Sequence, residues 1–131
     1  MPYEAEIRTS RSDRAASDPG SMLVQHHRAG HAELKLEQLT GGHLLHLALA
    51  GCVFNNVLRL AGEKGISVDD ASVLVSGGFT ERGDSTGFQC SVNVAGDAGA
   101  EQLRALAREA FDDSTVAVVL KRAAKVELVD A

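Results

Sequence analysis

The chain has 131 residues, which is the usual size of one domain. Hydrophobic residues make up 44% and charged residues 24%, close to the averages of globular proteins, so an intrinsically disordered or fibrous protein is excluded. The net charge is −5 and no run of basic residues occurs, which argues against a nucleic-acid-binding surface. We therefore expect one acidic, globular domain spanning residues 1–131.

Two cysteines, Cys52 and Cys90, are too few for a disulfide scaffold, so we expect a reducing, cytoplasmic environment. The first residues lack the charged and then apolar pattern of a signal peptide. The longest apolar stretch, from Leu44 to Leu60, is interrupted by polar and charged residues. We predict neither export nor a membrane span.

The first third of the chain has the pattern of short strands. We predict a strand over residues 3–9, then a polar loop over residues 10–21 that contains Arg11 and Arg14. Two more strands, over residues 22–25 and 32–36, flank a turn at residues 28–30. Together they predict a small sheet or hairpin.

A long apolar helix is predicted over residues 42–63. Its apolar positions are too dense and too extended for a strand, and they surround most of the helix, which indicates a central position in the fold. Thr40 is placed to cap its start, and Gly65 stands where the helix should end.

The remaining residues predict two strands over 69–75 and 87–95, a helix over 101–111 and a final strand over 125–129. We assign Gly77 and Gly78 to the connection between the two strands, and we assign the Gly41–Gly42 pair to a turn. Asp113 is predicted to cap a short helical turn that ends near Leu120. This order of elements predicts an α+β fold.

Cys52 lies near the middle of the central helix, on a stripe formed by residues 45, 49, 52, 56 and 60. A single buried cysteine is most often a small hydrophobic residue, and the helix dipole does not reach the middle of a helix. If Cys52 is reactive, a cation from another segment has to favour its thiolate, and Arg11 or Arg14 could supply it.

Five histidines fall between residues 26 and 46, but their spacing does not predict a metal site. His43 and His46 point away from Cys52 around the helix, and the adjacent His26 and His27 would face opposite sides of a strand. Cys90 shares one strand face with apolar residues, which predicts a structural core thiol. We expect no metal and no other cofactor.

The run Leu-Leu-His-Leu-Ala-Leu-Ala-Gly-Cys at residues 44–52, continued by Glu-Lys-Gly-Ile at residues 63–66 and then by paired strands, resembles the OsmC/Ohr family of osmotically induced and organic hydroperoxide resistance proteins. The resemblance covers most of the chain. It implies an OsmC-like fold, with antiparallel sheets wrapped around central helices in an intertwined homodimer whose active sites lie at the subunit interface.

The resemblance also implies roles for individual residues. Cys52 takes the position of the peroxidatic cysteine, and Arg11, with Arg14 nearly as good, takes that of the arginine. The second, resolving cysteine of the family corresponds to Ser114, and the family's glutamate corresponds to Gly42, next to His43. A serine cannot form a disulfide, so an external thiol would have to reduce an oxidised Cys52.

Two hypotheses follow from these positions. In the first, the protein is a one-Cys peroxidase that reduces small organic hydroperoxides through Cys52 with an external thiol reductant. In the second, it is a non-peroxidatic relative that binds a small hydrophobic molecule, or catalyses other chemistry, in the pocket between subunits. Arg14, His43, Asn56 and Ser114 would then contribute to binding.

Overall fold

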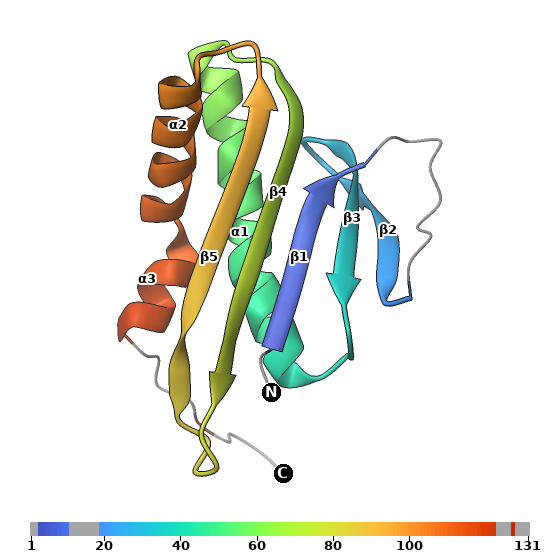
Figure 1. The fold of residues 1–131 in the computed structure, drawn as a ribbon, viewed down its shortest axis with the longest axis vertical. Helices are drawn as coiled ribbons and strands as arrows, with labels where there is room; N and C mark the ends of the chain where they lie inside the picture. Colours follow the sequence, from blue (N-terminus) through green and yellow to red (C-terminus); the bar gives the residue numbers. More distant parts are fainter. Residues whose placement is uncertain (1–2, 11–18, 123–126, 128–131) are drawn as a thin grey trace.

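The computed structural model describes residues 3–10, 19–122 and 127. Five antiparallel strands form one sheet in the order β2-β3-β1-β4-β5, and three helices pack against it (Figure 1). The elements are β1 (Tyr3–Thr9), β2 (Ser21–His26), β3 (Gly30–Leu36), α1 (Gly41–Lys64), β4 (Val68–Phe79), β5 (Ser85–Gly96), α2 (Ala100–Asp112) and α3 (Thr115–Arg122). The α+β fold predicted from the sequence is confirmed.

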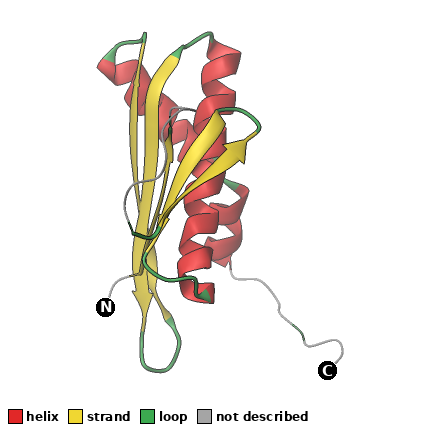
Figure 2. Cartoon of the chain, turned by 90° about the vertical axis from the view of Figure 1, so that its right-hand side faces the viewer, coloured by secondary structure: helices red, strands yellow, loops and turns green. Residues whose placement is uncertain are grey.

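The core lies between α1 and the long strands of the sheet. α1 packs on β1 and β4, and α2 packs beside α1 and against β5. Val53, Phe54 and Val57 of α1 are fully buried, as are Val73 and Val75 of β4. Arg28, in the turn of the β2–β3 hairpin, donates a hydrogen bond to Asn55 of α1 and so links the hairpin to the helix. Figure 2 shows this hairpin curving toward α1.

Both predicted ends of the central helix are confirmed. Thr40 Oγ1 accepts a hydrogen bond from the backbone N–H of His43, and Gly65 ends the helix in the left-handed conformation with φ of 70°. By length and composition alone this helix could cross a membrane, but half of its most apolar window is buried inside the fold. That burial is what a central core helix requires.

The strands β4 and β5 are longer than predicted, and the assignment of Gly77 and Gly78 to a turn was wrong. Both glycines lie inside β4. A Cβ atom at Gly77 would come within 2.3 Å of the Gly87 carbonyl oxygen and 2.7 Å of His46 Nε2, so a side chain at this position would displace its neighbours. The glycine is therefore explained by close packing. Likewise, Gly41 and Gly42 begin α1 and do not form a turn.

The junction of α2 and α3 also differs from the prediction. Asp113 is the residue at the C-terminal end of α2, and Ser114 Oγ accepts a hydrogen bond from the backbone N–H of Ala117 at 3.1 Å. Ser114, not Asp113, therefore caps α3. The strand predicted over residues 125–129 lies outside the described residues apart from Glu127.

Candidate functional site

Cys52 is half-buried in α1 and is a free thiol. One turn further along the same helix, Asn56 Nδ2 donates a hydrogen bond to the Ala110 carbonyl of α2 at 3.1 Å. The two helices run antiparallel (Figure 1). Cys52 precedes Asn56 by one helical turn, and Ser114 follows Ala110 by four residues. Because the two helices run in opposite directions, Cys52 and Ser114 lie at about the same level of the helix pair.

Ser114 and Asn56 both have structural hydrogen bonds. The Ser114 side chain is fully buried and its hydroxyl caps α3, while the Asn56 amide satisfies a carbonyl in the last turn of α2. The correspondence of Ser114 to a resolving position stays a prediction. However, a hydroxyl there offers no thiol with which Cys52 could form a disulfide.

Gly42, the position that corresponds to a glutamate in the resemblance, has no room for any side chain. A Cβ atom there would lie 2.6 Å from Cε2 of Tyr3 and 3.1 Å from Cε2 of Phe79. The tyrosine ring thus occupies the space that a Cβ atom at residue 42 would need. A carboxylate at residue 42 would require Tyr3 to move.

His43 does not replace that carboxylate next to Cys52. Its ring is buried, and its Nδ1 lies 2.6 Å from Thr40 Oγ1 at the start of the helix. Nine residues separate it from Cys52, which is roughly 13 Å along the helix axis at the usual rise per residue. Its contacts are with the helix cap and with the Tyr3 ring, whose centroid lies 4.7 Å from that of His43.

His46 belongs to an aromatic cluster at the same end of α1. It is fully buried, its ring is stacked on Tyr3 and it contacts Phe79 and Phe88. Its Nδ1 donates to the Gly42 carbonyl at 2.6 Å, and its Nε2 has no hydrogen-bond partner among the described residues. This histidine fixes the first turn of α1 against the sheet.

His26 and His27 were predicted to face opposite sides of a strand, and this is wrong. Their rings stack with centroids 4.9 Å apart, because His27 already lies in the turn after β2. Burial, followed by the charges of His27 and Arg28, lowers the pKa of His26. Within the described ranges, no three His, Cys, Asp or Glu side chains are grouped so that they could hold a metal ion.

Cys90 lies on the face of β5 that packs against α2. Burial raises the pKa of its thiol to about 11, so the thiol stays protonated at neutral pH. The strand face predicted for it is confirmed, since residues 88, 90, 92 and 94 alternate with exposed neighbours. Arg11 and Arg14, the candidate partners of Cys52, lie outside the described residues.

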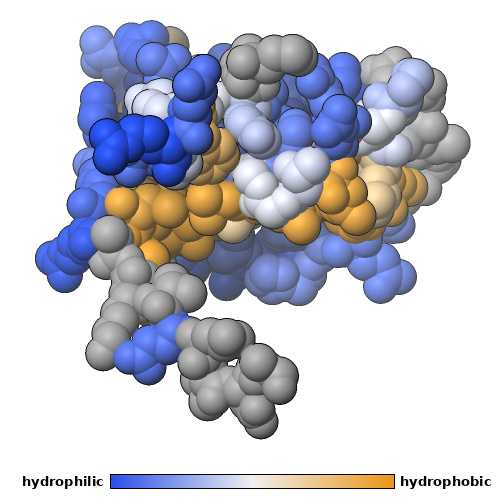
Figure 3. Space-filling view, turned by 90° about the horizontal axis from the view of Figure 1, so that it is seen from below, coloured by the Kyte–Doolittle hydropathy of each residue, from blue (hydrophilic) through white to orange (hydrophobic). Residues whose placement is uncertain are grey.

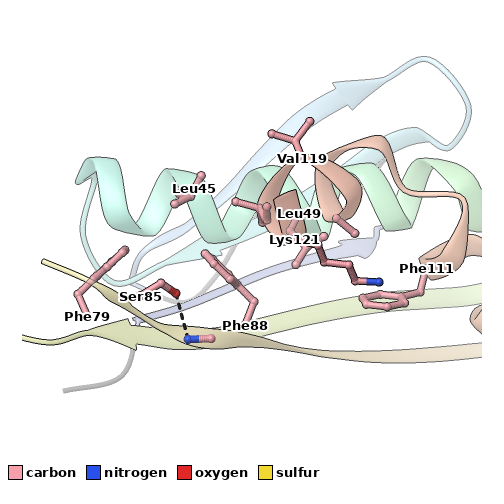
Figure 4. A pocket seen from close by; sticks show the side chains of 11 residues that line it. Leu45, Leu49, Phe79, Ser85, Phe88, Phe111, Val119 and Lys121 are labelled. Carbon is pink, nitrogen blue, oxygen red and sulfur yellow. Dashed lines mark hydrogen bonds between the residues drawn. The ribbon is translucent and has the colours of Figure 1, made fainter. Parts of the chain in front are cut away.

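A large apolar pocket opens between α1, the end of the β4–β5 hairpin and α3, and its described lining includes none of the site residues that the sequence predicted. Its volume is about 570 Å³. Figure 4 shows side chains from these elements converging on it. It is lined by Leu45, Leu49, Phe79, Ser85, Gly87, Phe88, Phe111, Ala117, Val119, Leu120 and Lys121. Cys52 is not among the lining residues, although it follows Leu45 and Leu49 on the same helical stripe.

Two residues of the pocket lining, Leu45 and Val119, belong to a set of exposed large apolar side chains that we call the exposed patch. The patch consists of Leu44 and Leu45 of α1 and Val118 and Val119 of α3, which are between 36% and 46% exposed. Figure 3 shows an apolar band crossing the face of the molecule that is seen from below, with hydrophilic surface on both sides. Contiguous apolar surface of this kind is typical of ligand or protein contact sites.

Comparison with known proteins places this geometry in a family. The model of the OsmC-like protein family matches residues 31–129. Among solved structures, an OsmC-like hydroperoxide resistance protein from Jannaschia sp. is similar in fold, with a TM-score of 0.58 and 13% sequence identity over 99% of this chain and 96% of that chain. No match was found among curated protein sequences.

Proposed function

Since the chain belongs to the OsmC-like protein family, we propose that it binds a small hydrophobic organic molecule in the pocket between α1, α3 and the β4–β5 hairpin. The observation that carries this proposal is the pocket itself. Its volume of about 570 Å³ lies in the usual range of small-molecule sites, and eight of its eleven lining residues are apolar and larger than glycine.

The pocket has few polar groups with which to bind a polar ligand. Among the described lining residues the polar side chains are those of Ser85 and Lys121, and Ser85 Oγ already accepts a hydrogen bond from the Gly87 N–H at 3.0 Å. A ligand with several polar groups would lose more bonds to water than these few groups could replace. Binding is therefore driven by the burial of apolar surface.

A neutral apolar dye, N-phenylnaphthylamine, tests this proposal directly, because the chain has no tryptophan to interfere with its fluorescence. We expect saturable binding by the native protein and weaker binding by Leu45→Gln, which places an amide at the pocket wall. Leu39→Gln is the matched control, because Leu39 is 76% exposed and does not line the pocket. Absence of saturable binding, or an equal loss in both variants, would contradict the proposal.

A second candidate function is one-Cys hydroperoxide reduction by Cys52. It is favoured by the partial exposure of this cysteine and by its place one helical turn from Asn56, which is bonded to α2. The Cys52 thiolate would attack the terminal peroxide oxygen, the O–O bond would break, and the product alcohol would leave after taking up a proton. The resulting sulfenic acid would be reduced by two equivalents of an external thiol, giving water and a disulfide of that thiol.

The Arg11 guanidinium is proposed, from the family resemblance, to stabilise the Cys52 thiolate. Consumption of cumene hydroperoxide in the presence of dithiothreitol should then depend on Cys52 and be lost in Cys52→Ser. Cys90→Ser is the control and should remain active, since the Cys90 thiol is protonated at neutral pH. A Cys52→Ser variant as active as the native protein would eliminate this candidate.

We also propose that a second copy of the chain covers the exposed patch of Leu44, Leu45, Val118 and Val119. Burial of these side chains against a partner would stabilise a homodimer and close the pocket mouth. Sedimentation equilibrium should give the mass of a dimer for the native chain and that of a monomer for Val118→Asp. A native monomer at micromolar concentration would contradict this part of the proposal.

A further inference from the structure

The pocket has one charged residue among its described lining residues, and it is Lys121. Its Nζ lies 5.1 Å from the centroid of the Phe111 ring, and no salt bridge to a described carboxylate engages it. Lys121 is exposed to water, so the attraction of its amine for an anion is favourable but weak. The lining therefore combines an apolar surface with one available positive charge.

Most of the phenylalanines of the chain gather at this pocket. Three of the four phenylalanines in the chain, Phe79, Phe88 and Phe111, line this one pocket. In Figure 4, Phe79 and Phe88 rise from the hairpin toward Leu45 and Leu49, while the Lys121 amine lies over Phe111 at the opposite end. Phenylalanine rings prefer edge-to-face contacts with another ring, and such contacts add to simple burial.

The end of the pocket with Phe79 and Phe88 suits an apolar ring, and the end with Lys121 suits a negative charge. The following inference deepens the ligand-binding function proposed above and rests on it. We propose that the pocket binds an aromatic monocarboxylic acid, with its ring between Phe79, Phe88 and Leu45 and its carboxylate at Lys121. Because Lys121 is the one cation among the described lining residues, the site fits a single negative charge. A phosphate or dicarboxylate would leave a second charge uncompensated.

Isothermal titration calorimetry with phenylbutyrate and its neutral counterpart phenylbutanol tests the charge preference. The native protein should bind the acid about fivefold more tightly than the alcohol, the ratio expected for a partly exposed ion pair. Lys121→Met, which keeps an apolar stem of similar length, should bind both compounds equally. Arg122→Met is the matched control, because Arg122 is the next residue on α3 but does not line the pocket.

Each other outcome identifies which statement fails. If phenylbutyrate and phenylbutanol bind the native protein equally, or if the preference survives in Lys121→Met, the carboxylate position is wrong. If octanoate binds as tightly as phenylbutyrate, the aromatic specificity is wrong. If the neutral dye also fails to bind, the ligand-binding function itself is refuted; saturable dye binding without acid preference refutes only the present inference.

Discussion

The two halves of α1 lie in the same helix but have different surroundings. In the second half, Val53, Phe54 and Val57 are completely buried between the sheet and α2. In the first half, Leu44 and Leu45 are exposed although they are equally apolar, and Leu45 lines the pocket. The comparison shows that the apolar residues of the second half are used by the core, whereas part of the apolar surface of the first half stays exposed.

Polar residues show the same division. The buried Asn56 of the second half joins α1 to α2 through the Ala110 carbonyl. The buried histidines of the first half, His43 and His46, instead fix the start of the helix, through Thr40 and the Gly42 carbonyl. Substitutions in the two halves should therefore have different effects on stability and on ligand binding.

The largest expected difference is between Phe54→Ala and Leu45→Ala. Removal of the fully buried Phe54 ring should lower the free energy of unfolding by about 3–5 kcal/mol, through lost burial and the cavity left behind. Leu45 is already 36% exposed, so its truncation should cost far less stability and should instead weaken binding of the neutral dye. Urea denaturation and dye titration of both variants measure the two effects.

Two results would contradict the comparison. If Leu45→Ala destabilises the protein as much as Phe54→Ala, Leu45 belongs to the structural core together with Leu49 and Ala50. If Leu45→Ala leaves dye affinity unchanged while the dye still binds, the dye occupies another site.

Most of the fold could be predicted from the sequence, because its determinants are local. The central helix has a capping residue at Thr40 and a glycine stop at Gly65, and the strands alternate between buried and exposed residues. Gly77 was misassigned because the requirement for glycine at this position comes from tertiary packing. The space of its side chain is taken by His46 Nε2 and the Gly87 carbonyl, residues that are distant in sequence or lie on the neighbouring strand.

The candidate site was harder to predict for the same reason. The position of Cys52 on the central helix could be recognised from the sequence around it. The pocket could not, since it is assembled from Leu45, Phe79, Phe111 and Val119, which come from four different elements. The sequence feature that could have pointed to the pocket is the scarcity of aromatic residues, because three of the four phenylalanines line it.

A smaller effect is expected at Gly42, where the first half of α1 meets β1. Replacing glycine by alanine inside a helix usually stabilises it, but here the added Cβ would lie 2.6 Å from the Tyr3 ring. We expect Gly42→Ala to lower the free energy of unfolding by about 1–3 kcal/mol through overpacking. In a Tyr3→Ala background the same substitution should cost nothing or should stabilise the protein.

A double-mutant cycle in urea measures this coupling. If Gly42→Ala has the same cost with and without the tyrosine ring, the clash is not its cause. In that case Tyr3 would not be what excludes a carboxylate from residue 42.

The smallest effect is expected at Thr40, which caps the first half of α1. Its Oγ1 accepts a hydrogen bond from the His43 N–H at 3.2 Å, and Thr40→Ala leaves that N–H without its partner, at a cost of about 1 kcal/mol. Thr40→Ser keeps the hydroxyl and should retain nearly all of the stability in urea denaturation. A serine variant as unstable as the alanine variant would show that the threonine methyl group, not the cap, is responsible. Because Thr40 does not line the pocket, a cap that only fixes the helix start should leave dye affinity unchanged in both variants.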